Sequence, residues 1–274
     1  MTKSAVRLVA PATPNAAGSV PNGILSKVPE VTAFFWIIKV LCTTVGETGA
    51  DLLSTRLGLG LTITSWIMSA LFVAALIWQV RIKQYQPPIY WITVVLISVV
   101  GTLISDNLVD GLGISLVTTS IAFSIILAIV FALWHRSEKT LSIHTIFTNK
   151  RELYYWAAIL FTFALGTSAG DLTAETLDVG YFWSAVVFAA MIAAVAVAYF
   201  VFKLDEILCF WIAYILTRPL GASIGDYLAK PVIAGGLGWG TIHTSLIFLG
   251  FILALVAYLT SSRTQPEIQV AAET

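Results

Sequence analysis

The sequence predicts an all-α integral membrane protein with eight transmembrane helices, and three observations predict it. Of the 274 residues, 58% are hydrophobic and only 11% are charged, with a mean hydropathy of +0.90, whereas a soluble domain is about half apolar and about a quarter charged. Long apolar stretches recur along the chain, and one aromatic motif recurs four times. The composition excludes a soluble enzyme and a disordered chain. It also excludes a secreted disulfide scaffold, since Cys42 and Cys209 both lie in apolar stretches.

The apolar stretches are long enough to cross a membrane. A helix needs about 20 mainly apolar residues to span a hydrocarbon core of roughly 30 Å. Five stretches reach this length without Asp, Glu, Lys or Arg, and three more are interrupted by a charge. The expected spans are residues 31–53, 59–80, 89–110, 113–134, 153–175, 179–202, 207–229 and 239–260.

The basic residues predict the orientation. An even number of spans puts both termini on one side, and the loops and tails of that side contain eleven Lys and Arg against two on the other. The positive-inside rule then makes both termini cytoplasmic. The first tail lacks the apolar core of a signal peptide. We expect a flexible cytoplasmic tail (1–30), a first half (31–134), a basic cytoplasmic loop (135–152), a second half (153–260) and a second cytoplasmic tail (261–274).

The recurring motif, aromatic-Trp-x9-Gly-x4-Asp, divides the chain into four repeats that end at Asp51, Asp106, Asp171 and Asp226. The first two Asp are 55 residues apart, as are the last two, but the middle two are 65 apart. This spacing indicates two related halves, each made of a pair of two-helix hairpins. All four repeats then have the same orientation, unlike those of inverted-repeat transporters. We expect the Trp to anchor each odd-numbered helix in the cytoplasmic interface and the Gly to face another helix.

Each odd-numbered helix has a polar stripe, because residues four apart share a helical face. The stripes widen toward the outer end, and four converging stripes would line a vestibule with an acidic mouth. Carboxylate oxygens suit protons, Mg²⁺, Ca²⁺ or Mn²⁺. The candidate ion-binding residues are Asp51, Asp106, Asp171, Asp226 and Glu47. The four Asp are also candidate metal ligands, and His243 is a further one. In the alternative interpretation, each Asp ends its helix at the interface and caps the following turn, and His243 is structural.

Two basic residues lie inside predicted spans. Lys39 and Arg218 are candidate charge-compensating or gating residues, paired with Glu47 and a neighbouring Asp. The alternative is snorkelling toward the cytoplasmic interface, which suits Lys39, three residues after Trp36, better than the deeper Arg218. Pro219 is expected to kink its helix.

The stretch Lys-Val-Pro-Glu-Val-Thr-Ala-Phe-Phe-Trp from Lys27, continuing through Thr-Thr-Val-Gly-Glu-Thr-Gly-Ala-Asp to Asp51, resembles the signature of a bacterial family. That family comprises uncharacterised membrane-anchored proteins built from a repeat of unknown function. The resemblance extends over all four repeats, roughly residues 27–260. It implies a multi-pass protein of the cytoplasmic (inner) membrane, and it brings no established substrate or catalytic residue.

The leading hypothesis is a secondary transporter or exporter of a small cation, either a divalent metal or a proton-coupled solute. One alternative is a pseudo-tetrameric cation channel, although the segment after Asp51 is too short for a pore helix and a selectivity filter. The other is a non-transporting membrane sensor or assembly partner.

The sequence contains none of the common catalytic motifs, so we expect no enzyme activity, no catalytic residue and no cofactor. The expected partners are the lipid bilayer and a small cation. The fifteen basic and fifteen acidic residues balance, which argues against nucleic acid. The oligomeric state is left open.

Overall fold

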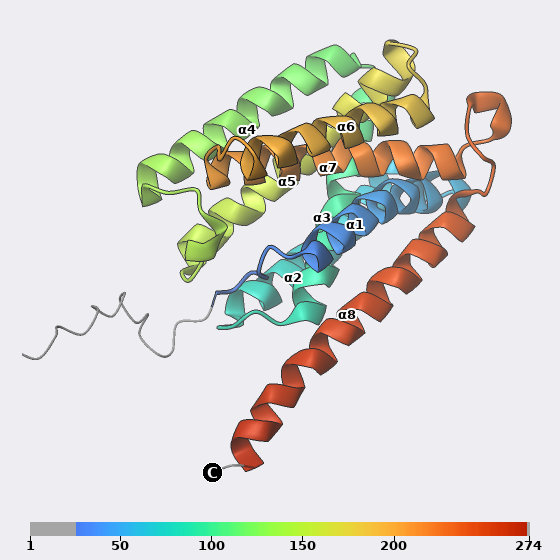
Figure 1. Ribbon diagram of the computed structural model, residues 1–274. Helices are drawn as coiled ribbons and strands as arrows, with labels where there is room; N and C mark the ends of the chain where they lie inside the picture. The colour runs from blue at the N-terminus through green and yellow to red at the C-terminus, as the bar shows by residue number, and fades with distance from the viewer. Residues whose placement is uncertain (1–25, 273–274) are drawn as a thin grey trace, which may run out of the picture.

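The computed structural model describes residues 26–272, and in this part of the chain eight helices are long and apolar enough to cross a membrane (Figure 1). The expected spans agree with them to within four residues at each end, except that the last helix continues through residues expected as a tail. The helices are α1 (Ala33–Asp51), α2 (Gly60–Arg81), α3 (Pro87–Asp106), α4 (Leu116–Glu138), α5 (Asn149–Asp171), α6 (Tyr181–Phe200), α7 (Glu206–Ala229) and α8 (Thr241–Ala272).

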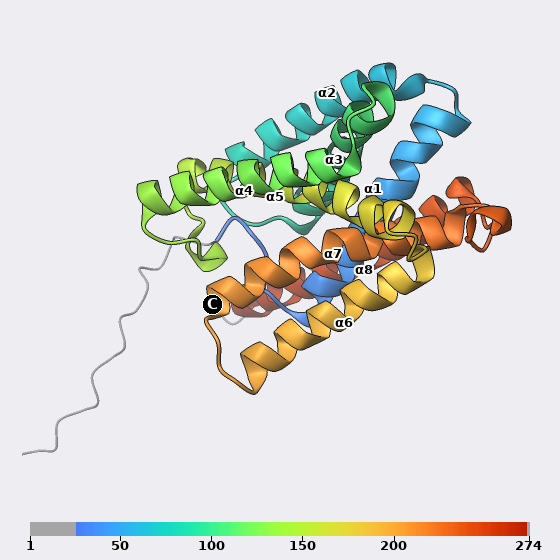
Figure 2. The ribbon, with the colours of Figure 1, turned by 90° about the horizontal axis from the view of Figure 1, so that it is seen from above.

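The four odd-numbered helices form a closed ring. Each packs against the next one along the chain, and α7 packs against α1 (Figures 1 and 2). More than half of each ring helix is buried, against about one-fifth of each even-numbered helix. The even-numbered helices therefore present large apolar faces outward, as expected of helices that contact lipid.

Each outer helix packs mainly against the ring helix of the next repeat rather than against that of its own. Thus α2 covers α3, α4 covers α5, α6 covers α7, and α8 returns to cover α1. Ser245 of α8 donates a hydrogen bond to Thr48 of α1, with 2.8 Å between the hydroxyl oxygens. The expected two-helix hairpins are therefore wrong as packing units, since the outer helix of one repeat joins it to the next.

The repeat glycine marks the contact between neighbouring ring helices. At each of the four positions a Cβ atom would overlap a residue of the next ring helix, three residues before that helix's own repeat glycine. Small residues at such contacts let backbones approach closely. The pairs are Gly46 with Ser98, Gly101 with Phe163, Gly166 with Arg218, and Gly221 with Thr43. The fourth pair returns to the first repeat, so the pattern closes on itself.

The aromatic-Trp dipeptides form a second closed pattern, at the end of the ring where the odd-numbered helices begin; we call this the aromatic end. The aromatic residue of each repeat packs against the Trp of the next. The ring centroids are 5.8 Å apart for Phe35 and Trp91, 5.6 Å for Tyr90 and Trp156, 6.3 Å for Tyr155 and Trp211, and 5.6 Å for Phe210 and Trp36.

The expected role as interfacial anchors is wrong for three of these four Trp residues. Trp91, Trp156 and Trp211 are buried, and Trp36 is half-buried. Their large side chains join neighbouring repeats, and contacts between aromatic rings contribute about 0.5–1.5 kcal/mol beyond the burial of their area.

The segment before α1 is packed onto the aromatic end. Lys27 donates to Glu152 (2.8 Å), to Asn149 Oδ1 (2.6 Å) and to the carbonyl of Val80 (2.9 Å). Gln79 donates to the other oxygen of the buried Glu152 carboxylate. The expectation of a flexible tail is therefore wrong at Lys27, and residues 1–25 of the expected tail lie outside the described part of the chain.

Candidate cation site in the ring

Arg218 connects all four repeats. Its guanidinium is fully buried, and its Nη2 atom lies against Glu47 of α1 (2.9 Å), Thr167 of α5 (2.7 Å) and Thr102 of α3. These three residues occupy the same repeat position, four residues before the Asp, where α7 has Ala222. The guanidinium lies where the four polar stripes meet. The convergence of the stripes that the sequence predicts is therefore present at this level.

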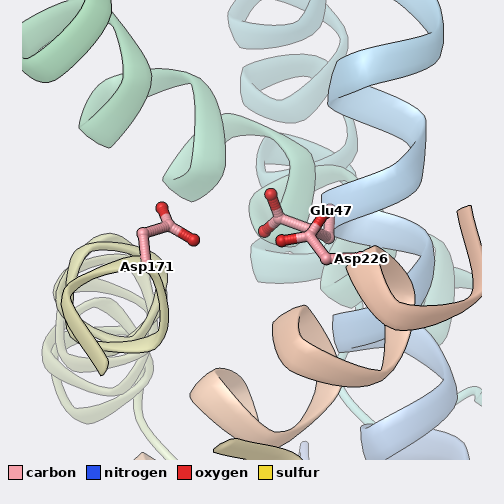
Figure 3. Close-up of side chains that lie close together, drawn as sticks. All are labelled: Glu47, Asp171 and Asp226. Atoms are coloured by element: carbon pink, nitrogen blue, oxygen red, sulfur yellow. The ribbon is translucent and has the colours of Figure 1, made fainter. Parts of the chain in front are cut away.

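Three carboxylates meet at the opposite end of the ring from the aromatic end; we call it the acidic end. One carboxylate oxygen from each of Glu47, Asp171 and Asp226 lies within 4.8 Å of the others. Figure 3 shows these side chains directed toward one another from α1, α5 and α7. Two oxygens on opposite sides of a Ca²⁺ ion at 2.3–2.6 Å are about 5 Å apart. The spacing therefore suits a bound cation.

The other two aspartates lie beside this cluster. Asp51 Oδ2 is 3.6 Å from the ammonium of Lys230, which is also 3.8 Å from Asp226 Oδ1. The Asp226 carboxylate, and more weakly that of Asp51, raises the pKa of Lys230 above its ordinary value, so the ammonium stays charged. Asp106 is half-buried at the end of α3 and has no ion-pair partner among the described residues.

Lys39 lies deeper in the ring, and it contacts aromatic rings rather than a carboxylate. Its ammonium is 3.9 Å from the centroid of Phe163 and 4.2 Å from that of Tyr214, a cation–π arrangement. Only 1% of the side chain surface is exposed, and Nζ has no hydrogen-bond partner among residues 26–272. The snorkelling interpretation is therefore wrong for Lys39, and so is its pairing with Glu47.

His243 lies apart from the carboxylates. It is exposed on α8, and its Nδ1 is 3.1 Å from the carbonyl of Trp239, one turn earlier. It does not belong to the group of potential metal ligands found in the described residues.

Three of the four ring helices change their hydrogen bonding directly after the repeat Asp. The π-helical turns Leu52–Arg56, Asn107–Gly111 and Leu172–Thr176 follow Asp51, Asp106 and Asp171. None of these three carboxylates caps the turn that follows it. The fourth helix, α7, ends at Ala229 instead, two residues before Pro231, which has no N–H to continue the helix. Single π turns occur frequently at functional sites, and the capping role considered for the Asp is absent at these three positions.

Pro219 lies within α7, which is a single helix from Glu206 to Ala229. Its ring packs beside Gly166 and Gly170 of α5, so this proline belongs to the small-residue contact between two ring helices.

Three residues of the site, Thr102, Thr167 and Lys230, were not predicted as functional from the sequence. The repeat frame contained the signal for the two threonines, because they align with Glu47. The position of Lys230 depends on the turn after α7, which no sequence pattern specified.

Fold and site define a multi-pass, all-helical membrane protein built from four repeats around a charged centre. The model of the family described as "Repeat of Unknown Function (DUF347)" matches four segments of the chain, residues 34–85, 89–140, 154–204 and 209–265. The chain belongs to this family. No curated protein and no solved structure matches it.

Proposed function

We propose that this protein is a secondary transporter or exporter of a small cation. The observation that carries the proposal is the cluster of Glu47, Asp171 and Asp226, three carboxylates from three repeats within 4.8 Å of one another. Carboxylates in a membrane span are costly unless a cation, a proton or water accompanies them. Among the described residues, Asp171 has neither an ion-pair partner nor a hydrogen bond to its carboxylate, which leaves it available to an incoming ion.

In this proposal, Arg218 couples cation binding to the packing of the repeats. Its guanidinium neutralises Glu47 at 2.9 Å, and a divalent cation would compete with it for the same carboxylate. Release of Arg218 from Glu47 would also alter its contacts with Thr102 and Thr167. Binding at the acidic end is thereby linked to the packing of all four repeats.

The remaining charged residues adjust the electrostatics of the site. Asp51 and Asp106 increase its negative potential, whereas Lys230 reduces it. Lys39 contacts the rings of Phe163 and Tyr214 and no carboxylate, so we assign it no charge-compensating role. The central position of Arg218 favours a transporter that alternates between states over a continuously open channel. We assign no catalytic reaction to the chain.

The proposal includes a topology in which both termini are cytoplasmic and the acidic end faces outward. It rests on the eleven basic residues of the terminal side against two on the other side. The bacterial cytoplasmic membrane is the proposed location.

Cation flux into proteoliposomes tests the proposal. We expect the reconstituted protein to move Mn²⁺, Ca²⁺ or Mg²⁺, or protons in exchange, and Asp171→Asn and Asp226→Asn to lower the initial rate at least tenfold. Asp178→Asn is the matched control, because Asp178 is exposed and lies outside the cluster. Equal rates in the control and in both cluster variants, or no flux above that of empty liposomes, would contradict a transport role.

A further inference from the structure

The fourfold pattern of the aromatic end is broken at one place, where α7 meets α1. Three of the repeat Trp side chains donate their indole N–H: Trp91 to the Tyr85 hydroxyl (3.0 Å), Trp156 to Glu152 (3.5 Å) and Trp211 to the carbonyl of Leu141 (3.0 Å). The indole of Trp36 has no acceptor among the described residues. The three partnered side chains are buried, whereas Trp36 is half-buried.

Trp36 lines a cavity of about 500 Å³ between α1, α6, α7 and the short helix Ile143–Thr145. This volume lies in the range of small-molecule sites, about 300–1,000 Å³. The walls are mainly apolar and include Phe210, Val195 and Ala196. Because Trp36 and Phe210 are partners in the aromatic pattern, the cavity opens directly onto the contact that closes the ring.

The polar part of the lining combines two acidic residues with Ser142 and His144. Asp205 and Glu206 both line the cavity, and its lining contains no Lys or Arg. His144 lies 3.5 Å from Glu206, with more than half of each side chain exposed. Asp205 also caps the first turn of α7 by accepting from the Leu208 N–H at 2.8 Å, which fixes its carboxylate at this position. An apolar cavity with aromatic walls and two carboxylates is complementary to an organic cation.

We propose that this cavity binds an amphiphile that has one ammonium group on an apolar body. The apolar body packs among Phe210, Val195 and Ala196. The ammonium lies near Glu206 and over one of the aromatic rings that line the cavity, where a cation–π contact stabilises it. The site lies at the aromatic end, away from the carboxylate cluster, and it does not depend on the proposed cation transport. A free amine and the amine headgroup of a lipid both have this chemistry.

Binding of tritiated benzyltrimethylammonium to the immobilised, full-length protein in dodecyl maltoside, followed by scintillation proximity, tests the proposal. We expect saturable binding that unlabelled probe displaces and that equal concentrations of benzyl alcohol or phenylacetate do not. Ala196→Phe fills the cavity, and Glu206→Gln removes a carboxylate; each should weaken binding at least tenfold. The matched controls are Ala190→Phe, on the exposed face of α6, and Glu30→Gln, an exposed acid outside the lining. Both should bind as the wild type does.

Two further arms complete the test. Displacement by lysophosphatidylethanolamine but not by lysophosphatidylglycerol would identify a lipid amine as the ligand, and failure of both lipids to displace would identify a free amine. Should Ala196→Phe not fold, Ala213→Leu fills the same cavity from α7. Absence of saturable binding, equal displacement by phenylacetate, or unchanged affinity in a folded cavity-filling variant would overturn the proposal. Asp171→Asn should retain binding, which separates this site from the transport site.

Discussion

The guanidinium of Arg218 and the carboxylate of Glu47 are 2.9 Å apart, although 171 residues separate them in the sequence. The contact joins the first repeat to the last, next to the glycine contact between Gly221 and Thr43. Both side chains are buried, so this ion pair lies inside the ring and not on its surface. Glu47 therefore belongs both to the contact that closes the ring and to the candidate cation site.

Arg218→Met should destabilise the protein strongly, because Glu47 would remain buried without its partner. Removal of one member of a buried pair costs about 3–5 kcal/mol. The double variant Arg218→Met/Glu47→Met should recover much of this loss, since apolar residues of similar volume replace such pairs at little cost. Melting temperatures of the four purified proteins measure the effect. Simple additivity of the two single changes would contradict the assigned pairing.

Alanine at any of the four repeat glycines should weaken the ring, because the new Cβ atom would overlap the next ring helix. Overpacking of this kind costs about 1–3 kcal/mol. Gly166→Ala is the clearest case, since its Cβ would meet both Arg218 and Pro219. The matched control is Gly250→Ala in α8, where the space around the new Cβ is open. Thermal melting should separate the two variants, and equal melting temperatures would argue against close packing of the ring.

Trp211→Ala should destabilise the protein far more than Trp183→Ala. Trp211 is buried between neighbouring repeats, whereas Trp183 is 61% exposed on α6. Loss of a large buried aromatic side chain costs about 3–5 kcal/mol. The comparison by thermal melting distinguishes the aromatic contacts seen here from an interfacial anchor, for which the two substitutions would have similar effects.

Cysteine labelling in intact bacterial cells should report the proposed topology. The native Cys42 and Cys209 are buried, and Lys83 and Leu112 are exposed at opposite ends of the spans. A membrane-impermeant maleimide should label Leu112→Cys in intact cells and Lys83→Cys only after permeabilisation. The reverse pattern would show that the acidic end faces the cytoplasm.

The sequence predicted the eight spans and the four repeats because both depend on local patterns. Hydropathy over about 20 residues locates each span, and the fixed spacing between Trp, Gly and Asp locates each repeat. The same spacing predicted that the glycine faces another helix, and the contact of Gly46 with Ser98 confirms this.

The packing order was not predictable in this way. Nothing local indicates that α2 covers α3 instead of α1, or that α8 returns to α1. The role of Trp91 was also missed, because an aromatic residue at the start of a span resembles an interfacial anchor unless its neighbour in the next repeat is known. For the candidate site, the polar stripes predicted that polar side chains of the four odd-numbered helices come together. Glu47 pairs with Arg218 and not with Lys39. This choice depends on how deep each side chain lies in the assembled ring and on where it points, which the sequence does not specify.

The most direct test of the cation site is the thermal stability of the purified protein with Mg²⁺, Ca²⁺ and Mn²⁺. A ligand that binds the native state raises the melting temperature by mass action. We expect at least one of these ions to raise it in the wild type and in Asp178→Asn, and to have no effect in Asp171→Asn or Asp226→Asn. No shift with any of the ions, or the same shift in all four proteins, would contradict a cation site formed by Glu47, Asp171 and Asp226.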